Sequence, residues 1–328
     1  TYYFIEKPAR NKNNKFNLII TIIFLFYFIL IVLNIFIIQN NGFNKRLPDI
    51  LKNNNVSKDT IINLLKNSEL KICHNNIDMC IFNNSSNKKI HIIGDSHMAS
   101  VTFDLKEKLV SKNYKYINST FDGCLYFPGF NLIDTKNKEI DQKCNDNYFQ
   151  KLKKNLIKDN DKIIIIGGRL PLYLSRREFD NYEGGVEFEN WMIRNNYISN
   201  SKYQTIEDSF INEILELSKN NFIILMYPIP EVGVNPVKKI WLNRQNKTSK
   251  EFKLNYITTS YEVFKNRTKS SFELLNSIQG DNIHRVYPHK LFCGTIIKDR
   301  CVTHDDKNVF YSDDDHPSIK GAEMINDL

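Results

Sequence analysis

An uncharged apolar run near the start of the chain restricts its folding more than any other feature of the sequence. The run, FNLIITIIFLFYFILIVLNIFII, covers residues 16–38 and contains 23 residues without a charge. At about 1.5 Å per residue, a helix of this length spans about 35 Å, which exceeds a hydrocarbon core of about 30 Å. A signal peptide would have a shorter apolar region followed by a small-residue cleavage site, and neither is found here. We therefore predict one transmembrane helix at 16–38.

The excess of basic residues lies mostly beside this run. The formal net charge is +8, and residues 1–46 hold six basic residues against one acidic residue, which leaves +3 for the other 282 residues. So small an excess on the body of the chain argues against binding to nucleic acid. Four basic residues precede the run and two follow it, which predicts that residues 1–15 are cytoplasmic and that the rest lies outside the bilayer.

All six cysteines follow the apolar run and form three sequence-local pairs. An even number of cysteines at separations of 7 to 20 residues favours disulfides in an oxidising compartment. A zinc site is disfavoured because no C-x2-C or H-x3-H spacing lies near them, and buried free thiols are the remaining alternative. The predicted disulfides are Cys73–Cys80, Cys124–Cys144 and Cys293–Cys301.

From residue 89 onward, apolar runs alternate with amphipathic stretches. Strands are expected at 89–94, 114–120, 162–168, 222–229 and 283–288. Helical patterns lie between them at 98–112, 148–160 and 205–220. Continuous apolar strands separated by helices indicate a parallel sheet that is covered on both faces. We therefore predict a three-layer α/β/α sandwich at 90–328.

Two other segments are expected to be largely irregular. Residues 39–89 are rich in Asn, Lys and Ser, with one short helical pattern at 59–70, and this composition predicts a stalk or linker that contains the first disulfide. Residues 170–203 show no clear periodicity and are expected to form a long insertion within the sandwich.

A serine follows the first expected strand, in the sequence HIIGDSHMAS. Ligand chemistry in an open parallel sheet gathers beyond the carboxyl ends of the strands, where Ser96 stands. A serine hydroxyl needs a base to become a nucleophile. Of the seven histidines, His316 in YSDDDHPSIKG fits best, because Asp313 is spaced to hold one ring nitrogen while the other faces Ser96. His91 belongs to the strand, and His97 is expected to point away from the nucleophile.

These residues also have purely structural interpretations. Ser96 alone suits a helix N-cap, and DDDH alone suits a solvated acidic loop or a divalent-cation site. His304, in THDD, also has an acidic neighbour and is an alternative base. Asp95 is expected to support the turn before the helix through backbone hydrogen bonds, and Asp314 and Asp315 are expected to be nearly dispensable.

The order of these motifs resembles a known superfamily. GDSH near the start of the domain and DxxH near its end resemble the first and last signature blocks of the SGNH hydrolases. TYYFIEKPAR before the apolar run is similar to the end of the membrane acyltransferase-3 family, whose members often carry an SGNH domain after their last membrane helix. PIPEVGVNP and the cysteine pair ahead of FYSDDDH are also similar to these fusions. The resemblance covers nearly the whole chain and implies an SGNH-type, flavodoxin-like sandwich after a last transmembrane helix.

The resemblance also implies roles for individual residues. Ser96, Asp313 and His316 would form the catalytic triad, with Ser96 as the nucleophile that accepts the acyl group. The backbone N–H groups of Ser96 and Gly123, the glycine of FDGC, would form an oxyanion hole. No metal and no cofactor is implied for this segment.

The family's third signature block is altered in this chain. Gly167, Gly168 and Arg169 stand where the family has Gly-x-Asn-Asp. Loss of one oxyanion donor can cost ~10²–10³ in rate, so we expect either a substitute donor or slow turnover. Arg169 either adds positive charge at the site or forms a structural salt bridge.

The chain begins with Thr1, and its first ten residues resemble the end of a multi-span domain. We therefore expect it to be the carboxyl-terminal part of a longer protein. Its partner would be the N-terminal membrane acyltransferase domain of that protein, which handles an acyl donor derived from acetyl-CoA. The expected location is the inner membrane, with the catalytic domain periplasmic or extracellular.

The function expected from these observations is extracytoplasmic O-acylation, most simply O-acetylation, of sugar hydroxyls on a cell-envelope polysaccharide. One alternative is a carbohydrate O-acetyl esterase of the same fold, in which water takes the acyl group. Another is a carbohydrate-binding domain with a degenerate triad, which the missing third-block asparagine favours.

Overall fold

The chain divides into two compact units, Thr1–Lys52 and Asn53–Leu328. The computed structural model describes residues 6–7, 16–40, 42, 47–52, 57–187, 194–245 and 254–328. The first unit contains helices α2 (Phe16–Gln39) and α3 (Asp49–Lys52). The predicted cytoplasmic segment 1–15 lies outside the described residues, apart from Glu6 and Lys7.

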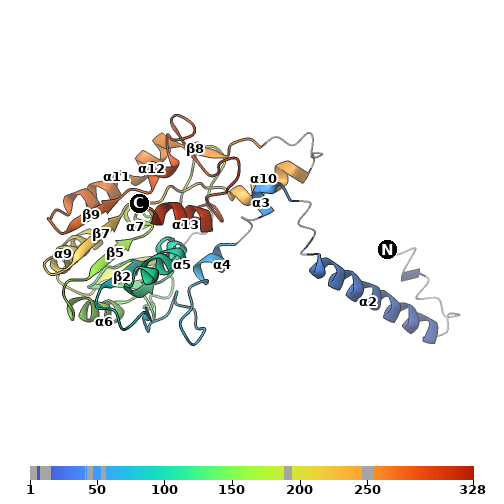
Figure 1. Ribbon diagram of the computed structural model, residues 1–328, viewed down its shortest axis with the longest axis horizontal. Coiled ribbons are helices and arrows are strands. Elements are labelled where there is room, and N and C mark those ends of the chain that lie inside the picture. The colour runs from blue at the N-terminus through green and yellow to red at the C-terminus, as the bar shows by residue number, and fades with distance from the viewer. Residues whose placement is uncertain are drawn as a thin grey trace. The chain divides into compact units, whose positions relative to one another are not determined.

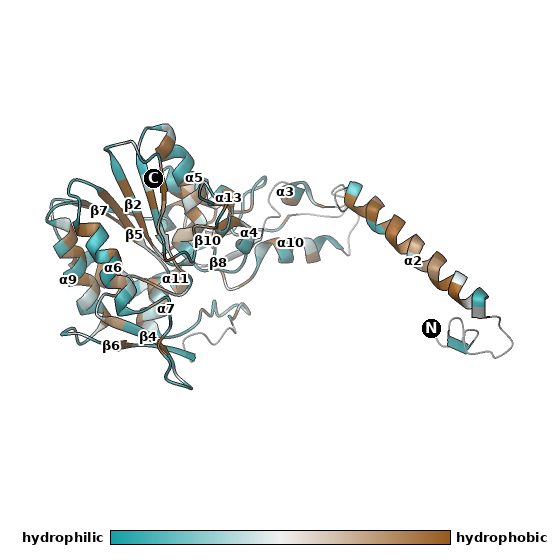
Figure 2. Cartoon of the chain, turned by 90° about the horizontal axis from the view of Figure 1, so that it is seen from below, coloured by the Kyte–Doolittle hydropathy of each residue, from teal (hydrophilic) through white to brown (hydrophobic). Residues whose placement is uncertain are grey.

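Helix α2 coincides with the predicted membrane span. Its stretch Ile20–Gln39 has a mean hydropathy of 2.9 and is long and apolar enough to cross a membrane. Apolar residues cover the helix along its length (Figure 2), and their side chains are exposed, as in Phe24 at 70%. A helix that is apolar all round needs apolar surroundings, so its composition suits a lipid environment.

A six-stranded sheet in the order β1-β3-β2-β5-β7-β9 forms the centre of the second unit (Figure 1). The strands are β1 (Cys80–Phe82), β2 (Lys89–Gly94), β3 (Lys115–Thr120), β5 (Ile163–Gly167), β7 (Phe222–Met226) and β9 (Ile283–Val286). All neighbours run parallel except β1, which is antiparallel to β3. The five predicted strands are confirmed, and β7 ends before Pro228 because proline has no N–H to donate to the ladder.

Helices cover both faces of this sheet. They include α5 (Ser96–Ser111), α6 (Asp146–Ile157), α9 (Ile206–Ser218), α11 (Tyr261–Ser277) and α13 (Ile319–Asn326). Ile164 and Ile166 of β5 belong to the apolar cluster with α6, α9 and α11, whereas Ile165 belongs to the cluster with α5 and α13. This alternation is the period of two expected for a strand that is buried on both faces, and it confirms the predicted three-layer sandwich.

The two segments expected to be irregular contain regular structure. The predicted stalk contributes α4 (Lys58–Ile62), which is shorter than the helix expected at 59–70, and the edge strand β1. The predicted insertion contains α7 (Leu170–Ser175) and β6 (Asn195–Ser199), which pairs with β4 (Phe130–Asp134). Strand β6 has the sequence NNYIS, which is too short and too polar to show an apolar period. Residues 188–193 of this segment lie outside the described residues.

The remaining elements lie toward the carboxyl end of the chain. They are α10 (Pro236–Gln245), α12 (His289–Phe292) and a two-stranded sheet of β8 (Thr258–Ser260) and β10 (Arg300–Val302). The loop between β10 and α13 carries the DDDH motif, so this end of the chain returns to the carboxyl end of the central sheet.

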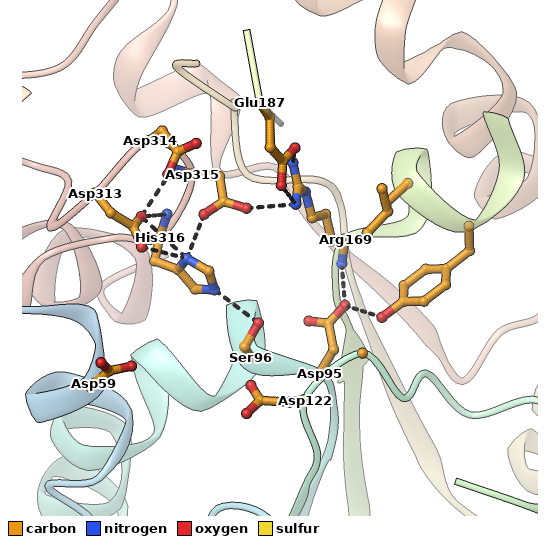
Figure 3. Close-up of a pocket in the computed structure, with 13 residues that line it drawn as sticks. Asp59, Asp95, Ser96, Asp122, Arg169, Glu187, Asp313, Asp314, Asp315 and His316 are labelled. Atoms are coloured by element: carbon orange, nitrogen blue, oxygen red, sulfur yellow. Dashed lines mark hydrogen bonds and ion pairs between the residues drawn. The ribbon is translucent and has the colours of Figure 1, made fainter. Parts of the chain in front are cut away.

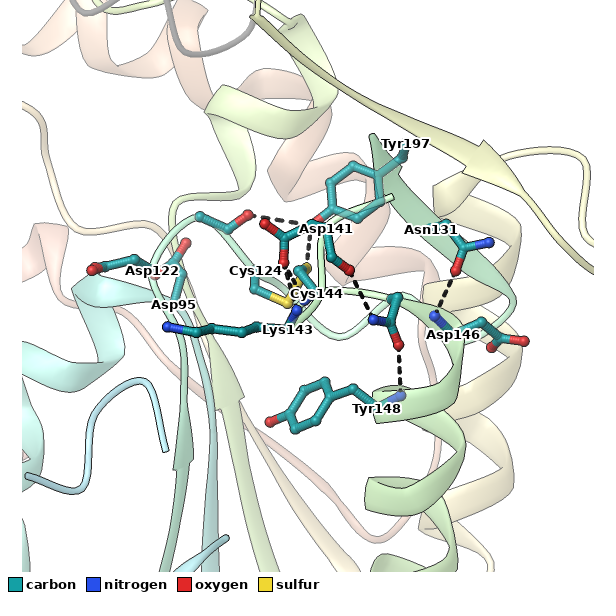
Figure 4. The surroundings of a disulfide bond; sticks show 12 residues. Asp95, Asp122, Cys124, Asn131, Asp141, Lys143, Cys144, Asp146, Tyr148 and Tyr197 are labelled. Carbon is teal, nitrogen blue, oxygen red and sulfur yellow. Dashed lines mark hydrogen bonds between the residues drawn. A yellow bond between two sulfur atoms is a disulfide. The ribbon is translucent and has the colours of Figure 1, made fainter. Parts of the chain in front are cut away.

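All six cysteines form disulfides, with the predicted pairing: Cys73–Cys80, Cys124–Cys144 and Cys293–Cys301. The Cys124–Cys144 bond joins the loop after β3 to the segment that leads into α6 (Figure 4). The hydroxyl of Tyr197 donates to the backbone oxygen of Gly123 at 3.3 Å, beside this bond. The Cys124–Cys144 disulfide therefore restrains the backbone next to Gly123.

Removing this disulfide should lower the stability of the fold. The double variant Cys124→Ser/Cys144→Ser should lose about 2–4 kcal/mol in the free energy of unfolding, because the cross-link limits the unfolded chain. Its partners are 20 residues apart, against 8 for Cys293–Cys301, so the chain-entropy relation predicts a larger loss than in Cys293→Ser/Cys301→Ser, by roughly 1 kcal/mol. Urea unfolding of the full chain in detergent measures both. Equal stability of all three chains would contradict this prediction.

Candidate active site

Ser96 begins helix α5 at the carboxyl end of β2, and Asp95 caps that helix. One carboxylate oxygen of Asp95 accepts from the backbone N–H of His97 at 3.0 Å. The other accepts from the backbone N–H of Arg169 at 2.7 Å and from the hydroxyl of Tyr173 at 3.1 Å. The expected role of Asp95 in supporting the turn is confirmed, and the same contacts tie the end of β2 to the segment after β5. Ser96 itself is the first residue of the helix and not its cap.

The structure brings Ser96, His316 and Asp313 together, as Figure 3 shows. The Oγ of Ser96 lies 2.8 Å from Nε2 of His316. Nδ1 of the same ring lies 3.0 and 3.2 Å from the two carboxylate oxygens of Asp313. Asp313 Oδ1 also accepts from the backbone N–H of His316 at 2.7 Å, which fixes the loop around the ring. His316 lies in the loop before α13, because Ser318 is the N-cap of that helix.

Asp315 is a second carboxylate on His316, and sequence reasoning missed it. The residue is 4% exposed, and its Oδ1 forms an ion pair with Nδ1 of His316. Its Oδ2 lies 3.1 Å from Nε2 of His97 and 2.9 Å from Nη1 of Arg169. A buried carboxylate with three charged or polar partners is part of the site, so the expectation that Asp315 is nearly dispensable is one for substitution to test. His97 also points toward the site and not away from it.

Arg169 is the centre of a buried ion-pair network. Its guanidinium donates to both oxygens of Glu187 and to Glu231 at 2.7 Å, and its Nη1 forms an ion pair with Asp315 at 2.9 Å. Arg267 from α11 holds the other oxygen of Glu231 at 2.8 Å. Of the two roles expected for Arg169, the structure shows the salt bridge, since its donors are bound to carboxylates.

The backbone conformation and close packing at Gly168 explain why a glycine stands at this position of the altered third block. Its backbone φ is +151°, and a Cβ at this position would lie 2.8 Å from Oδ2 of Asp95 and from Cδ1 of Leu125. The third-block segment therefore passes directly against the carboxylate that caps α5. Only glycine permits this approach together with this backbone conformation.

A pocket of about 190 Å³ lies beside Ser96 and His316. Gly123 also lines it, with φ +59°, so the two residues predicted for the oxyanion hole share one cavity. Seven of the thirteen lining residues are acidic, among them Asp59 from α4 and Asp122 from the loop after β3. His74 supports this loop, because its Nε2 lies 2.9 Å from Asp122 Oδ1. The pocket is thus strongly acidic around one serine.

Burial and neighbouring charges set the protonation of these groups. Burial disfavours the charged imidazolium of His316, but the negative charge of Asp315 and the hydrogen bonds that the ring donates to Asp313 and Asp315 outweigh it and raise its pKa to about 10. Burial also opposes the charge of Asp315, but Arg169 and His316 hold its pKa well below the usual range. Burial, then Asp315 and Asp313, raise the pKa of Asp314 to about 6. These contacts favour the protonated imidazole, so His316 can act as the base of Ser96 only after it has lost this proton.

The alternative base His304 lies in a different environment. Its Nε2 accepts from the backbone N–H of Ile257 at 3.1 Å, and its Nδ1 lies 2.8 Å from the carbonyl oxygen of Asp305. Both ring nitrogens therefore have structural partners. His91 pairs with Ser119 at 2.9 Å within the sheet, where burial lowers its pKa to about 3.

Among the residues that the structure describes, two groups of His and acidic side chains have possible ligand atoms within 4.8 Å of one another: His97 with Asp315 and His316, and Asp313 with Asp314 and Asp315. In the first group the facing atoms already pair with one another and with Arg169, whose charge opposes a cation. The expected absence of a metal stays a prediction.

An α/β/α sandwich with a serine after its first parallel strand, and a histidine near its carboxyl end within hydrogen-bond distance of that serine, defines an SGNH-type domain. The model of the family described as the SGNH domain fused to AT3 domains matches residues 66–328. The chain belongs to this family. The matched region begins within the predicted stalk, as does the compact second unit.

Solved structures with a similar fold include the periplasmic domain of a lipopolysaccharide acetyltransferase from Salmonella ser. Paratyphi A, at 16% identity and a TM-score of 0.46 over 74% of this chain and 82% of that one. A GDSL-like lipase from Bacteroides thetaiotaomicron has 9% identity and a TM-score of 0.36 over 74% and 85%. A carbohydrate esterase family 2 enzyme from Corynascus thermopiles has 9% identity and a TM-score of 0.33 over 74% and 64%. No curated protein matches the chain in sequence.

Proposed function

We propose that this chain is the catalytic part of an extracytoplasmic O-acyltransferase that transfers an acyl group, most simply acetyl, to sugar hydroxyls of a cell-envelope polysaccharide. The observation that carries the proposal is the 2.8 Å contact between Ser96 Oγ and His316 Nε2, with carboxylates on the other ring nitrogen. This is the geometry that nucleophilic catalysis by serine requires. The membership in a family of SGNH domains fused to AT3 domains supports a membrane acyltransferase partner in the same longer chain.

The proposed reaction has two steps. Ser96 Oγ attacks the carbonyl carbon of the acyl donor, His316 takes the serine proton, and the leaving group departs with that proton as the acyl-serine forms. A sugar hydroxyl then attacks the acyl-serine, gives its proton to His316, and leaves as the ester while Ser96 Oγ recovers a proton. The N–H groups of Ser96 and Gly123 stabilise the oxyanion in both steps.

The location of the domain follows from the same proposal. Helix α2 anchors the chain in the inner membrane, the donor is derived from acetyl-CoA, and the AT3 domain passes the acyl group across the bilayer to Ser96. The three disulfides suit the oxidising space outside the cytoplasm.

The acidic lining of the pocket bears on the acceptor. Asp59, Asp122, Asp313 and Asp314 are only partly buried or exposed, and they surround the cavity beside Ser96. A phosphate or carboxylate on the acceptor would meet these like charges at close range, where the repulsion is weakly screened. We therefore propose that the accepted sugars are neutral or carry an amine.

The division of acetyl groups between a sugar acceptor and water distinguishes transfer from hydrolysis. The full chain in detergent, given p-nitrophenyl acetate and an excess of neutral oligosaccharide, should move acetyl to the sugar faster than to water. Mass spectrometry of the sugar and an assay of free acetate measure the two products. Amino-sugar oligomers should also accept, and uronic-acid oligomers should accept at least about tenfold less, which corresponds to roughly 1.4 kcal/mol.

Each other result points to a different function. Free acetate as the main product with every acceptor would favour the esterase. Release of p-nitrophenol no faster than in buffer, together with retention of the sugar, would favour the carbohydrate-binding alternative.

A further inference from the structure

Arg169, in the segment after β5, adds a positive charge to the site. This segment is the altered third block, in which the family's asparagine is missing. Arg169 is 8% exposed, and its backbone N–H is already fixed by Asp95 at 2.7 Å. Its guanidinium is held by Glu231 and by both oxygens of Glu187, so its orientation is set before Asp315 is considered. Figure 3 shows the contact with Glu187. A planar guanidinium with several fixed partners is held in one orientation. In that orientation its Nη1 forms an ion pair with Oδ2 of Asp315 at 2.9 Å.

Asp315 connects this guanidinium to the imidazole. Its Oδ2 faces Arg169 and its Oδ1 faces Nδ1 of His316, so one buried carboxylate lies between two cationic partners. A rotation of Asp315 away from His316 would leave the guanidinium without one of its acceptors. Arg169 therefore holds the carboxylate against the ring and also offsets part of its charge.

Several other groups face His316 and contribute to its electrostatic environment. Asp313 lies on the same loop, and from α5 come Ser96 and His97, whose ring centroid is 4.9 Å from that of His316. Asp59 from α4 and Asp122 from the loop after β3 line the same pocket, and both add negative charge. Among the pocket-lining residues that the structure describes, Arg169 is the one permanent cation that opposes this acidic set.

We propose that Arg169 is a positioning residue that acts through Asp315 on His316, and so sets how readily His316 accepts the proton of Ser96. The inference rests on the proposed function only for the identity of Ser96 as the nucleophile. In the family, the asparagine of the third block is an oxyanion donor. In this chain we assign Arg169 of that block a different role, which is to set how readily His316 takes up a proton.

The charges predict opposite shifts for two substitutions. Asp315→Asn removes a negative charge from Nδ1, so the protonation midpoint of His316 should fall by about 1–3 pH units. Arg169→Gln removes the positive charge that offsets Asp315, Glu187 and Glu231, so the midpoint should rise. Arg169→Lys keeps the charge, and its midpoint should lie between those of Arg169→Gln and the unsubstituted chain. A residue that only supports the fold would move none of these midpoints in a charge-dependent way.

Histidine NMR of the full chain in detergent measures the midpoint without any need for turnover. The chain carries ring-¹³C-labelled histidine, and the His316 resonance is assigned by its loss in His316→Gln. Arg300→Gln is the matched control, because Arg300 forms a two-point ion pair with Glu183 outside the pocket. This control should leave the midpoint unchanged.

Reaction of Ser96 with an alkyl fluorophosphonate links the midpoint to the nucleophile. The serine oxygen bonds to phosphorus, fluoride leaves, and His316 takes the hydroxyl proton, so the rate should rise with pH through the same midpoint. Intact-mass spectrometry follows the adduct. Opposite NMR shifts without any adduct would refute Ser96 as the nucleophile and leave the link between Arg169 and His316 intact.

Shifts of the same sign in Asp315→Asn and Arg169→Gln, or no shift in either variant, would overturn the proposal. If Arg169→Gln does not fold, Asp315→Asn and Arg169→Lys decide it. In that case an unshifted midpoint in Asp315→Asn overturns the proposal. A lowered midpoint there, with a raised one in Arg169→Lys, supports it, and an unchanged or lowered midpoint in Arg169→Lys counts against it.

Discussion

Replacement of Ser96 by alanine should abolish the acyl-enzyme and nearly all turnover. The side chain supplies the atom that bonds to the acyl carbon, and the 2.8 Å contact with His316 Nε2 is the route by which its proton leaves. Loss of a nucleophile in a serine triad lowers the rate by roughly 10⁶, with a residue of catalysis from the oxyanion donors and from binding. The full chain incubated with p-nitrophenyl acetate should gain one acetyl by intact mass, and Ser96→Ala should gain none. Release of p-nitrophenol gives the rate.

Ser111→Ala is a matched control, because it makes the same chemical change at the other end of α5. The hydroxyl of Ser111 donates to the backbone oxygen of Lys108 at 2.8 Å and lies at the protein surface. This variant should label and turn over like the unsubstituted chain. Acetylation that persists in Ser96→Ala at the original rate would show that another residue is the nucleophile.

The sheet could be predicted from the sequence because its strands are buried on both faces. In β5 four consecutive isoleucines fill both apolar clusters, so the run itself marks the strand. Strands β1 and β6 could not be predicted in this way. Strand β1 has only three residues, Cys80–Phe82, and strand β6 is polar, so neither shows the long apolar run of a central strand. Their positions depend on partners that are distant in sequence.

The candidate site was predicted where its contacts are local or carried by a recognisable motif. The spacing of Asp313 and His316 is local, and GDSH marked Ser96 through a family resemblance. The contacts of Asp315 and Arg169 could not be predicted, because they join a loop near the carboxyl end to the segment after β5. In an irregular loop no period dictates which side of the backbone a residue faces, so the sequence did not show that Asp315 lies buried against the ring of His316.

Two carboxylates on one ring nitrogen predict redundancy within the triad. Asp313→Asn leaves Asp315 on Nδ1, and Asp315→Asn leaves Asp313, so each single variant should lose far less activity than Ser96→Ala. In Asp315→Asn the lower pKa of His316 also enlarges the neutral fraction at pH 7, which partly offsets the loss of orientation. The double variant Asp313→Asn/Asp315→Asn has no carboxylate to fix the tautomer, and its rate should fall by about 10⁴.

The single and double variants together form a cycle whose coupling energy measures this redundancy. The coupling energy is obtained from the rates of p-nitrophenol release at pH 7 and 9 in the unsubstituted chain, the two single variants and the double variant. Circular dichroism checks that each chain is folded. Asp314→Asn is the control, since Asp314 lies between the two carboxylates in sequence and shows no hydrogen bond from its side chain to the ring of His316 among the described residues. A loss in Asp313→Asn alone as large as in the double variant would mean that Asp313 is the orienting carboxylate by itself. Additive losses would mean that the two carboxylates act independently, and a strongly non-additive loss is what their shared contact with Nδ1 predicts.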